Sequence, residues 1–214
     1  MKYYQDITLL PDAEVSLGFI WEKVYQQIHL LLVEHKGAEG GSELGLSFPA
    51  YGDKEFPLGN QLRLLANTQT QLEVVNVSQW LQRFTDYVHI KSIKPVPSGV
   101  AEYVCFSRYN PKSQQRRLKL LEGRVAHLAV KHGVDEQTIR AQLLTAIEQR
   151  PDGRTPPYIN VQSLSTPLAG QQRHKFRLFI QRDKAVAASD NSNLFTCYGL
   201  SSKVPGNAAP VPWF

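Results

Sequence analysis

The stretch Ser16–His35, SLGFIWEKVYQQIHLLLVEH, decides how the first half of the chain folds. Its apolar residues recur at helical spacing, at Leu17, Ile20, Trp21, Val24, Ile28, Leu31 and Leu32. Ser16 is a suitable N-cap, and Gly37, Gly40 and Gly41 interrupt the pattern afterwards. The sequence therefore predicts one long amphipathic helix from Ser16 to about His35.

Strand patterns flank this helix on both sides. Lys2–Leu10 alternates polar and apolar residues as a half-buried strand does, and Pro11 ends the pattern. After the helix, the patterns predict strands at Leu44–Phe48 and Gln61–Leu65, a second helix at Leu72–Phe84 and a strand at Val88–Val96. The order β-α-β-β-α-β is that of the ferredoxin-like split βαβ unit, so we expect a ferredoxin-like domain over residues 1–96.

A second domain is expected over residues 97–214, because Pro95, Pro97 and Gly99 mark a boundary. Its predicted elements are a strand at Ala101–Tyr109, a basic helix at about 113–132, a helix at Asp135–Gln149, and strands near Tyr158–Ser163, Lys175–Arg182 and Leu194–Leu200. Trp213 and Phe214 are costly to leave in water, so we expect the tail to be docked. The predicted fold class is α+β, with an α/β C-terminal half that carries the basic helix.

Basic residues are concentrated in the stretch around this helix. Within Arg108–Lys131 seven residues are Lys or Arg, and only Glu122 is acidic. A helical wheel places Arg117, Arg124, His127 and Lys131 within one quarter of the circumference, while Leu118, Leu121, Val125, Leu128 and Ala129 cluster on another. Such a face is either an ordinary solvated surface or a surface aimed at phosphates.

The charge distribution favours a polyanionic partner. Residues 1–95 hold 8 Lys/Arg against 11 Asp/Glu, a net charge of −3, whereas residues 96–214 hold 16 against 8, a net charge of +8. Clustered positive charge raises the local concentration of anionic partners and releases counterions on binding. An anionic membrane fits less well, because no strongly apolar face accompanies the charge.

Several classes of protein are disfavoured by the sequence. No run approaches the roughly 18 apolar residues of a membrane span, and the N-terminus lacks the apolar core of a signal peptide, so we expect a cytoplasmic protein. Cys105 and Cys197 have no C-x-x-C partner and suggest neither a zinc site nor a disulfide. P-loops and dinucleotide fingerprints are absent too, so catalysis would come from side chains alone, with no metal or cofactor.

His29 is a candidate for acid–base chemistry, because it lies near the junction of the apolar and polar faces of the first predicted helix. It is either a hydrogen-bonded structural residue or a general acid/base, whose ordinary pKa of about 6.5 suits proton exchange at neutral pH. A second candidate is the hydroxyl cluster of Ser163, Ser165 and Thr166 at a predicted strand end. These hydroxyls either satisfy loop backbone groups or contact phosphate and ribose.

Phe176 stands between Lys175 and Arg177 in a basic, aromatic run. It is either a core residue of its strand or an exposed ring on which an unpaired base could stack.

Eight short blocks in order carry a resemblance to a known family: Asp6-Ile7, His29, Gly45–Pro49, Ser107-Arg108, Gln162–Thr166, Phe176–Ile180, Phe195–Ser201 and Val211–Phe214. With these blocks the chain resembles the CRISPR repeat-RNA processing endoribonucleases of subtype I-F over almost its whole length. It departs from them at Leu120 and Leu121, where a denser arginine cluster would be expected, and at Asn110, where a longer glutamine is common. Residues 167–173 and 189–193 look like loop insertions.

The resemblance implies a protein that grips the stem of a CRISPR repeat hairpin, cuts precursor RNA at the 3′ side of that stem, keeps the product and joins a multisubunit surveillance complex. By position, His29 would be the catalytic histidine, Ser163 the serine near the attacking ribose, with Ser165 as an alternative, and Tyr198 a supporting tyrosine. Arg108 and Asn110 would read bases at the foot of the stem, where Phe176 would stack. The further RNA contacts expected from the basic helix and the hydroxyl cluster are Arg116, Arg117, Lys119, Arg124, His127, Lys131, Ser165 and Thr166.

The expected chemistry requires no metal, since RNA carries its own nucleophile, the 2′-OH. His29 would act as general base and Ser163 would fix the ribose, leaving a 2′,3′-cyclic phosphate and a 5′-OH. The alternative is a hairpin-RNA-binding subunit without catalysis. A serine hydrolase built on Ser163 is disfavoured, because the G-x-S-x-G motif is absent.

Overall fold

The computed structural model describes residues 1–37, 40–111, 120–148, 156–163, 174–186, 194–204 and 206–214. It divides the chain into two compact units. The first comprises Met1–Tyr109 and Pro156–Phe214, and the second comprises Asn110–Thr155. The described residues of the first unit combine two antiparallel sheets with helices and those of the second form two helices, which confirms the α+β class.

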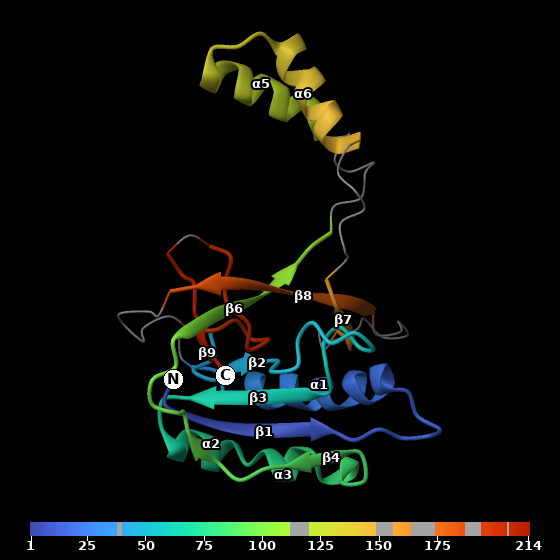
Figure 1. Cartoon of the computed structure of the whole chain (residues 1–214), viewed down its shortest axis with the longest axis vertical. Coiled ribbons are helices and arrows are strands. Elements are labelled where there is room, and N and C mark those ends of the chain that lie inside the picture. Colours follow the sequence, from blue (N-terminus) through green and yellow to red (C-terminus); the bar gives the residue numbers. More distant parts are fainter. Residues whose placement is uncertain (38–39, 112–119, 149–155, 164–173, 187–193, 205) are drawn as a thin grey trace, which may run out of the picture. The chain divides into compact units, whose positions relative to one another are not determined.

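The first sheet is built from strands near the N-terminus (Figure 1). Its strands are β1 (Tyr3–Leu9), β2 (Gly45–Ser47), β3 (Gln61–Ala66), β4 (Val88–Ile90) and β5 (Lys94–Pro95). They are ordered β2-β3-β1-β4, with β5 also paired to β1, and every pairing is antiparallel. β3 lies between β1 and β2, as in a split βαβ unit. The ferredoxin-like assignment of residues 1–96 is compatible with this order and stays a prediction.

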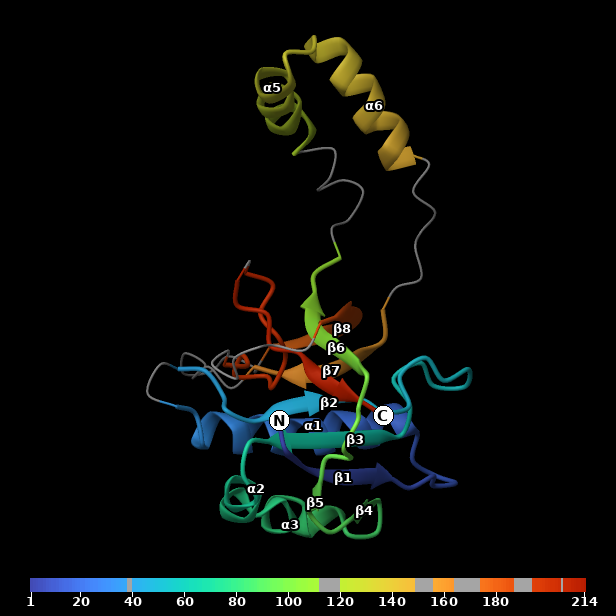
Figure 2. The same cartoon turned by 60° about the vertical axis from the view of Figure 1, so that its left-hand side comes forward.

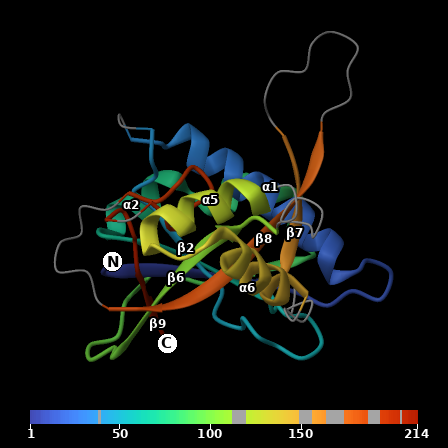
Figure 3. The same cartoon turned by 90° about the horizontal axis from the view of Figure 1, so that it is seen from above.

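The long helix α1 (Leu17–Glu34) confirms the prediction for this stretch. The Ser16 hydroxyl accepts a hydrogen bond from the Phe19 amide at its first turn. The apolar side of the helix is buried, and the Trp21 indole donates to the Gly59 carbonyl at 2.8 Å. α1 contacts both sheets, through β1 and through β7 (Tyr158–Gln162), and Figure 3 shows β7 beside it.

The second predicted helix, Leu72–Phe84, is wrong in its bounds and its continuity. Three short pieces replace it: α2 (Gln69–Val75), α3 (Val77–Trp80) and the 3-10 turn η1 (Gln82–Phe84). α2 starts earlier than predicted because Thr68 and Gln71 form a capping box, and it ends at Asn76, whose φ of 41° is left-handed. The predicted strand Val88–Val96 is likewise split into β4 and β5.

The second sheet contains β6 (Glu102–Tyr109), β7, β8 (Lys175–Ala185) and β9 (Val211–Trp213), in the antiparallel order β7-β8-β6-β9. The strand predicted near Leu194–Leu200 is wrong, because this stretch turns back on itself and Phe195 makes a single bridge to Ser42. The tail is docked as predicted, since β9 pairs with β6.

The two sheets share one hydrophobic core within the first unit. The predicted domain boundary near residue 96 separates the strands of the first sheet from those of the second. The compact units divide elsewhere, after Tyr109 and before Pro156. The division into domains 1–96 and 97–214 therefore stays a prediction.

Arg63 joins the first sheet to the tail. Its guanidinium makes two hydrogen bonds to the Asp6 carboxylate, at 2.6 and 3.1 Å, and a third to the main-chain oxygen of Phe214 at 3.0 Å. The rings of Tyr4 and Phe214 lie 4.4 and 4.0 Å from its central carbon. Arg63 and Asp6 are each only 5% exposed, so this is a buried ion pair enclosed by two aromatic rings.

The described part of the second unit contains the helix pair α5 (Leu121–His132) and α6 (Glu136–Glu148), shown in Figure 2. Leu121 and Val125 of α5 pack against Ile139 of α6, and Arg140 pairs with Glu122. Asp135 caps α6 by accepting hydrogen bonds from the amides of the next turn. The predicted helix at Asp135–Gln149 is confirmed as far as Glu148. Of the basic helix predicted at about 113–132, residues 112–119 lie outside the described residues.

Candidate active site

His29 lies on the buried side of α1, with 7% of its surface exposed. Its Nδ1 is 2.9 Å from the main-chain carbonyl oxygen of Cys197. A carbonyl can only accept a hydrogen bond, so Nδ1 carries the proton. In the neutral ring the lone pair is then on Nε2, which is the arrangement that a general base needs.

The surroundings of His29 favour its neutral form. Burial lowers the pKa of the imidazole, and the hydrogen bond to Cys197 offsets this in part by raising it. The ordinary histidine pKa of about 6.5 is already below neutral pH. His29 is therefore an uncharged base at neutral pH in the free protein.

Tyr198 covers one face of the His29 ring. The two rings are stacked, with centroids 4.5 Å apart and an angle of 5° between the planes. Burial raises the pKa of the Tyr198 phenol, so this group stays protonated at neutral pH. The stack fixes the plane of the imidazole, and the tyrosine that provides it is uncharged.

Arg108 and Phe176 extend this arrangement outward. Phe176 of β8 makes an edge-to-face contact with Tyr198 at 6.5 Å, and the exposed Arg108 of β6 lies 5.2 Å from the Phe176 ring and 5.9 Å from the Tyr198 ring. We call His29, Tyr198, Phe176 and Arg108 the His29 cluster. Four separate segments of the chain supply it, so the fold brings together four of the predicted site residues.

Ser163 follows directly after β7, next to α1. The Gln162 amide donates to the side-chain oxygen of Gln26 at 3.0 Å, and Gln26 lies one helical turn before His29. The Ser163 amide donates to the His174 carbonyl at 2.8 Å. Ser163 is half-buried, and in the described part of the chain its hydroxyl makes no hydrogen bond to His29. Ser165 and Thr166 lie outside the described residues.

The second unit carries several of the predicted RNA-binding residues. Arg124, His127 and Lys131 are exposed on α5, while Leu121 and Val125 are buried on its other side, as the helical wheel predicts. Asn110 is also exposed. Within the described ranges neither Arg124 nor Lys131 has an ion-pair partner, whereas Arg140 of α6 pairs with Glu122. Arg116, Arg117 and Lys119 lie outside the described residues.

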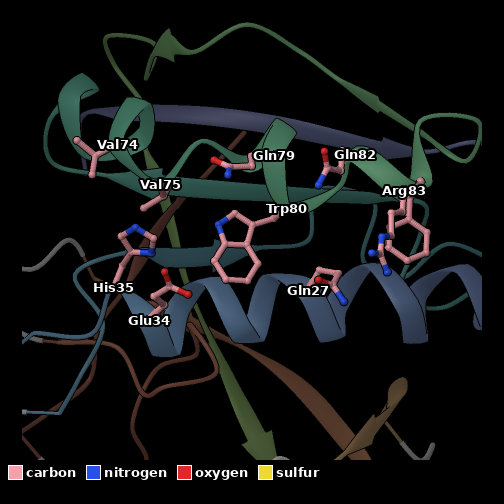
Figure 4. A pocket seen from close by; sticks show the side chains of 10 residues that line it. Gln27, Glu34, His35, Val74, Val75, Gln79, Trp80, Gln82 and Arg83 are labelled. Atoms are coloured by element: carbon pink, nitrogen blue, oxygen red, sulfur yellow. The ribbon is translucent and has the colours of Figure 1, made fainter.

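A groove of about 560 Å³ lies between α1 and the α2–η1 segment. Figure 4 shows the Trp80 ring pointing toward α1, between the side chains of Glu34 and Gln27. None of the residues that line the groove belongs to the His29 cluster or to the predicted site.

Two kinds of feature are absent from the residues that the structure describes. No three His, Cys, Asp or Glu side chains are grouped as a metal site would need. No described helix is long and apolar enough to cross a membrane.

Comparison with known proteins places the chain in a family. The model of the family described as CRISPR-associated protein (Cas_Csy4) matches residues 4–214. The chain belongs to this family. The resemblance seen in the sequence is therefore confirmed at the level of the family.

Two curated relatives of the Cas_Csy4 family match along their full lengths. A protein of Escherichia coli (strain UTI89 / UPEC) is 32% identical over 216 residues, and one of Pseudomonas aeruginosa (strain UCBPP-PA14) is 29% identical over 214. Each match covers 100% of this chain and 100% of the relative. Both relatives are named CRISPR-associated endonuclease Cas6/Csy4.

Proposed function

We propose that this member of the Cas_Csy4 family is a metal-independent endoribonuclease that cleaves CRISPR repeat hairpins in precursor RNA at the 3′ side of the stem. The observation that carries the proposal is the buried, neutral His29, whose Nδ1 proton is engaged by the Cys197 carbonyl, which leaves Nε2 as the base. The names of the two relatives support an endonuclease, and the exposed basic side chains of α5 support a polyanionic substrate.

The reaction uses the nucleophile that RNA itself provides. His29 Nε2 removes the proton of the 2′-OH, and the 2′ oxygen attacks the adjacent phosphorus. The bond from phosphorus to the 5′ oxygen breaks, which leaves a 2′,3′-cyclic phosphate and, after protonation of the leaving oxygen, a 5′-OH. Ser163 fixes the ribose and Tyr198 supports the imidazole through the ring stack. The phosphates of bound RNA raise the pKa of His29 and so offset the effect of burial.

Arg108 and Phe176 are suited to binding the RNA at the foot of the stem. A cation and an aromatic face together provide both a charge for phosphate or guanine and a surface for stacking. Phe176 is only partly buried, so its ring is available to an unpaired base. Asn110, two residues further along, reads a base in the same region.

The basic face of α5 binds the stem itself. A-form RNA has a deep, narrow major groove, so a helix inserts only where that groove opens near a stem end or loop. A short hairpin meets this requirement. Arg124, His127 and Lys131, with Arg116, Arg117 and Lys119 from the preceding stretch, supply the phosphate contacts, and Ser165 and Thr166 contact the RNA near the cleavage point.

Tight phosphate contacts on the stem imply that the mature RNA stays bound after the cut. The partners we infer are the repeat hairpin and the other subunits of a type I-F surveillance complex, in the cytoplasm. The second candidate function is a hairpin-binding subunit without catalysis. It is disfavoured because His29 keeps a hydrogen-bonded tautomer suited to a base.

One experiment separates these functions. The protein is incubated with its cognate repeat RNA in EDTA, and the ends of the products are analysed. Cutting at one site that yields a 2′,3′-cyclic phosphate supports the proposed function. Tight binding without cutting supports the binding subunit. The absence of both binding and cutting contradicts both functions.

The salt dependence of RNA binding tests the face of α5. Replacing Arg124 or Lys131 by glutamine is expected to lower the slope of log K against log salt by about 0.9 each, since each removes one phosphate contact. Arg83→Gln is the matched control, because Arg83 is exposed on η1 in the first unit. It should leave the slope unchanged. Equal slopes for Arg124→Gln and the wild type would show that the Arg124 side chain contacts solvent and not a phosphate.

A further inference from the structure

Two side chains of α1 hold successive carbonyls of one turn. The Tyr25 hydroxyl donates to the main-chain oxygen of Tyr198 at 3.0 Å, and His29 Nδ1 donates to the preceding carbonyl, that of Cys197, at 2.9 Å. Tyr25 and His29 lie one helical turn apart on the same face of the helix. The tyrosine thus binds the peptide group next to the one that engages the histidine.

The turn that carries these carbonyls, residues 195–201, is also held by main-chain hydrogen bonds at both ends and at Gly199, whose carbonyl accepts from the Leu46 amide at 2.8 Å. Phe195 exchanges two main-chain hydrogen bonds with Ser42, and the Ser201 amide donates to the Phe106 carbonyl at 2.7 Å. Gly199 has a left-handed φ of 69° that a non-glycine residue would adopt only with strain. At Cys197 and Tyr198, Tyr25 and His29 are the two side chains of α1 that bind the main chain of this turn.

Tyr25 is suited to a fixed donor role. It has no exposed surface. Burial raises the pKa of its phenol well above the usual range, and the neighbouring Tyr198 and Cys197 raise it further. The hydroxyl therefore keeps its proton at neutral pH.

We propose that Tyr25 is a positioning residue for His29: its hydroxyl holds the Tyr198–Gly199 peptide, and through it the adjoining Cys197–Tyr198 peptide, so that the Cys197 carbonyl selects the Nδ1–H tautomer of the imidazole. This inference rests on the proposed function, in which Nε2 is the base. Without the Tyr25 hydroxyl the Tyr198 carbonyl loses its partner, so the peptide groups at Cys197 and Tyr198 are less constrained and the hydrogen bond to Nδ1 weakens. The ring then also populates the tautomer with Nε2 protonated, which cannot accept the 2′-OH proton.

Tyr25→Phe is the variant that tests this role, because it keeps the buried ring and removes one oxygen. Single-turnover cleavage of repeat RNA is expected to slow about 10- to 100-fold, as small misplacements of a reacting group do. RNA affinity should not change. The matched control is Tyr51→Phe, because Tyr51 also donates to a main-chain oxygen, that of Ile180 at 3.0 Å, and lies outside the His29 cluster. It should cleave at the wild-type rate.

The tautomer of His29 provides a second measurement that needs no RNA. Nitrogen-15 NMR of the imidazole, above its pKa, should show Nδ1 protonated in the wild type and in Tyr51→Phe, and a mixture of tautomers in Tyr25→Phe. An unchanged tautomer and rate in Tyr25→Phe would overturn the inference, as would an equal loss of rate in both variants. If the wild type fails to cut RNA, the proposed function is wrong, and the NMR comparison still decides whether Tyr25 positions His29.

Discussion

Replacement of His29 by alanine is expected to slow cleavage of the repeat RNA by about 10²- to 10⁴-fold, the usual contribution of a general base. In the proposed mechanism this variant removes the side chain whose Nε2 accepts the 2′-OH proton, while the exposed basic face of α5 is untouched. The expected result is therefore a loss of rate at unchanged affinity. Single-turnover kinetics with saturating protein, paired with a binding titration, measure the two separately.

His35→Ala is the matched control for this variant. His35 follows the end of the same helix, and its Nδ1 also lies 2.9 Å from a main-chain oxygen, that of Leu31. It has no contact with Tyr198, so its loss should leave the cleavage rate unchanged. Cleavage by His29→Ala at the rate of His35→Ala would remove His29 from the mechanism, and a large loss of affinity in His29→Ala would make it a binding residue.

Replacement of Arg63 by methionine is expected to lower the free energy of unfolding by about 3–5 kcal/mol. The substitution leaves the Asp6 carboxylate, which is 5% exposed, without the cation to which it is bound. It also removes the guanidinium from between the rings of Tyr4 and Phe214. Urea unfolding monitored by circular dichroism measures the loss.

Two further variants separate the buried pair from other effects of the substitution. Lys23→Met removes the more exposed ion pair with Glu22, at 3.5 Å, and should cost at most about 1 kcal/mol. Asp6→Asn combined with Arg63→Met removes both charges and should recover part of the loss, because no unpaired carboxylate remains. A loss for Arg63→Met no larger than that for Lys23→Met would show that the buried pair contributes little.

Local sequence patterns predicted most elements of the fold. They failed where residues distant in the sequence determine the conformation of a segment. α1 and the strands β1, β2 and β3 follow from periodicity within their own sequences. Leu194–Leu200 has the composition of a strand, yet Phe195 fills a space beside Gly45, where an added Cβ would lie 2.5 Å from the Phe195 ring. That space depends on a glycine about 150 residues away in sequence, so no local pattern reveals it.

The candidate site could be predicted only in part, because some of its contacts also involve residues that are distant in the sequence. The position of His29 within α1 and the family blocks indicated the residues of the His29 cluster, and the fold brings these four together. The partner that sets the tautomer of His29 is a main-chain carbonyl 168 residues away. Every residue has such a carbonyl, so the residue type does not reveal which one accepts the hydrogen bond. Tyr25 lies one turn before His29, a spacing that could have suggested it, but the acceptor of its hydroxyl is again main chain.

The central claim, that the 2′-OH of the RNA is the nucleophile and no metal ion is required, is tested most directly with one altered substrate. A synthetic repeat hairpin with a single 2′-deoxy nucleotide at the scissile position is incubated with the protein in EDTA beside the all-ribose hairpin. The proposed mechanism predicts that the all-ribose hairpin is cut to a 2′,3′-cyclic phosphate, while the deoxy hairpin is bound equally well and stays intact. Cleavage of the deoxy hairpin would contradict it, as would a requirement for added metal by the all-ribose hairpin.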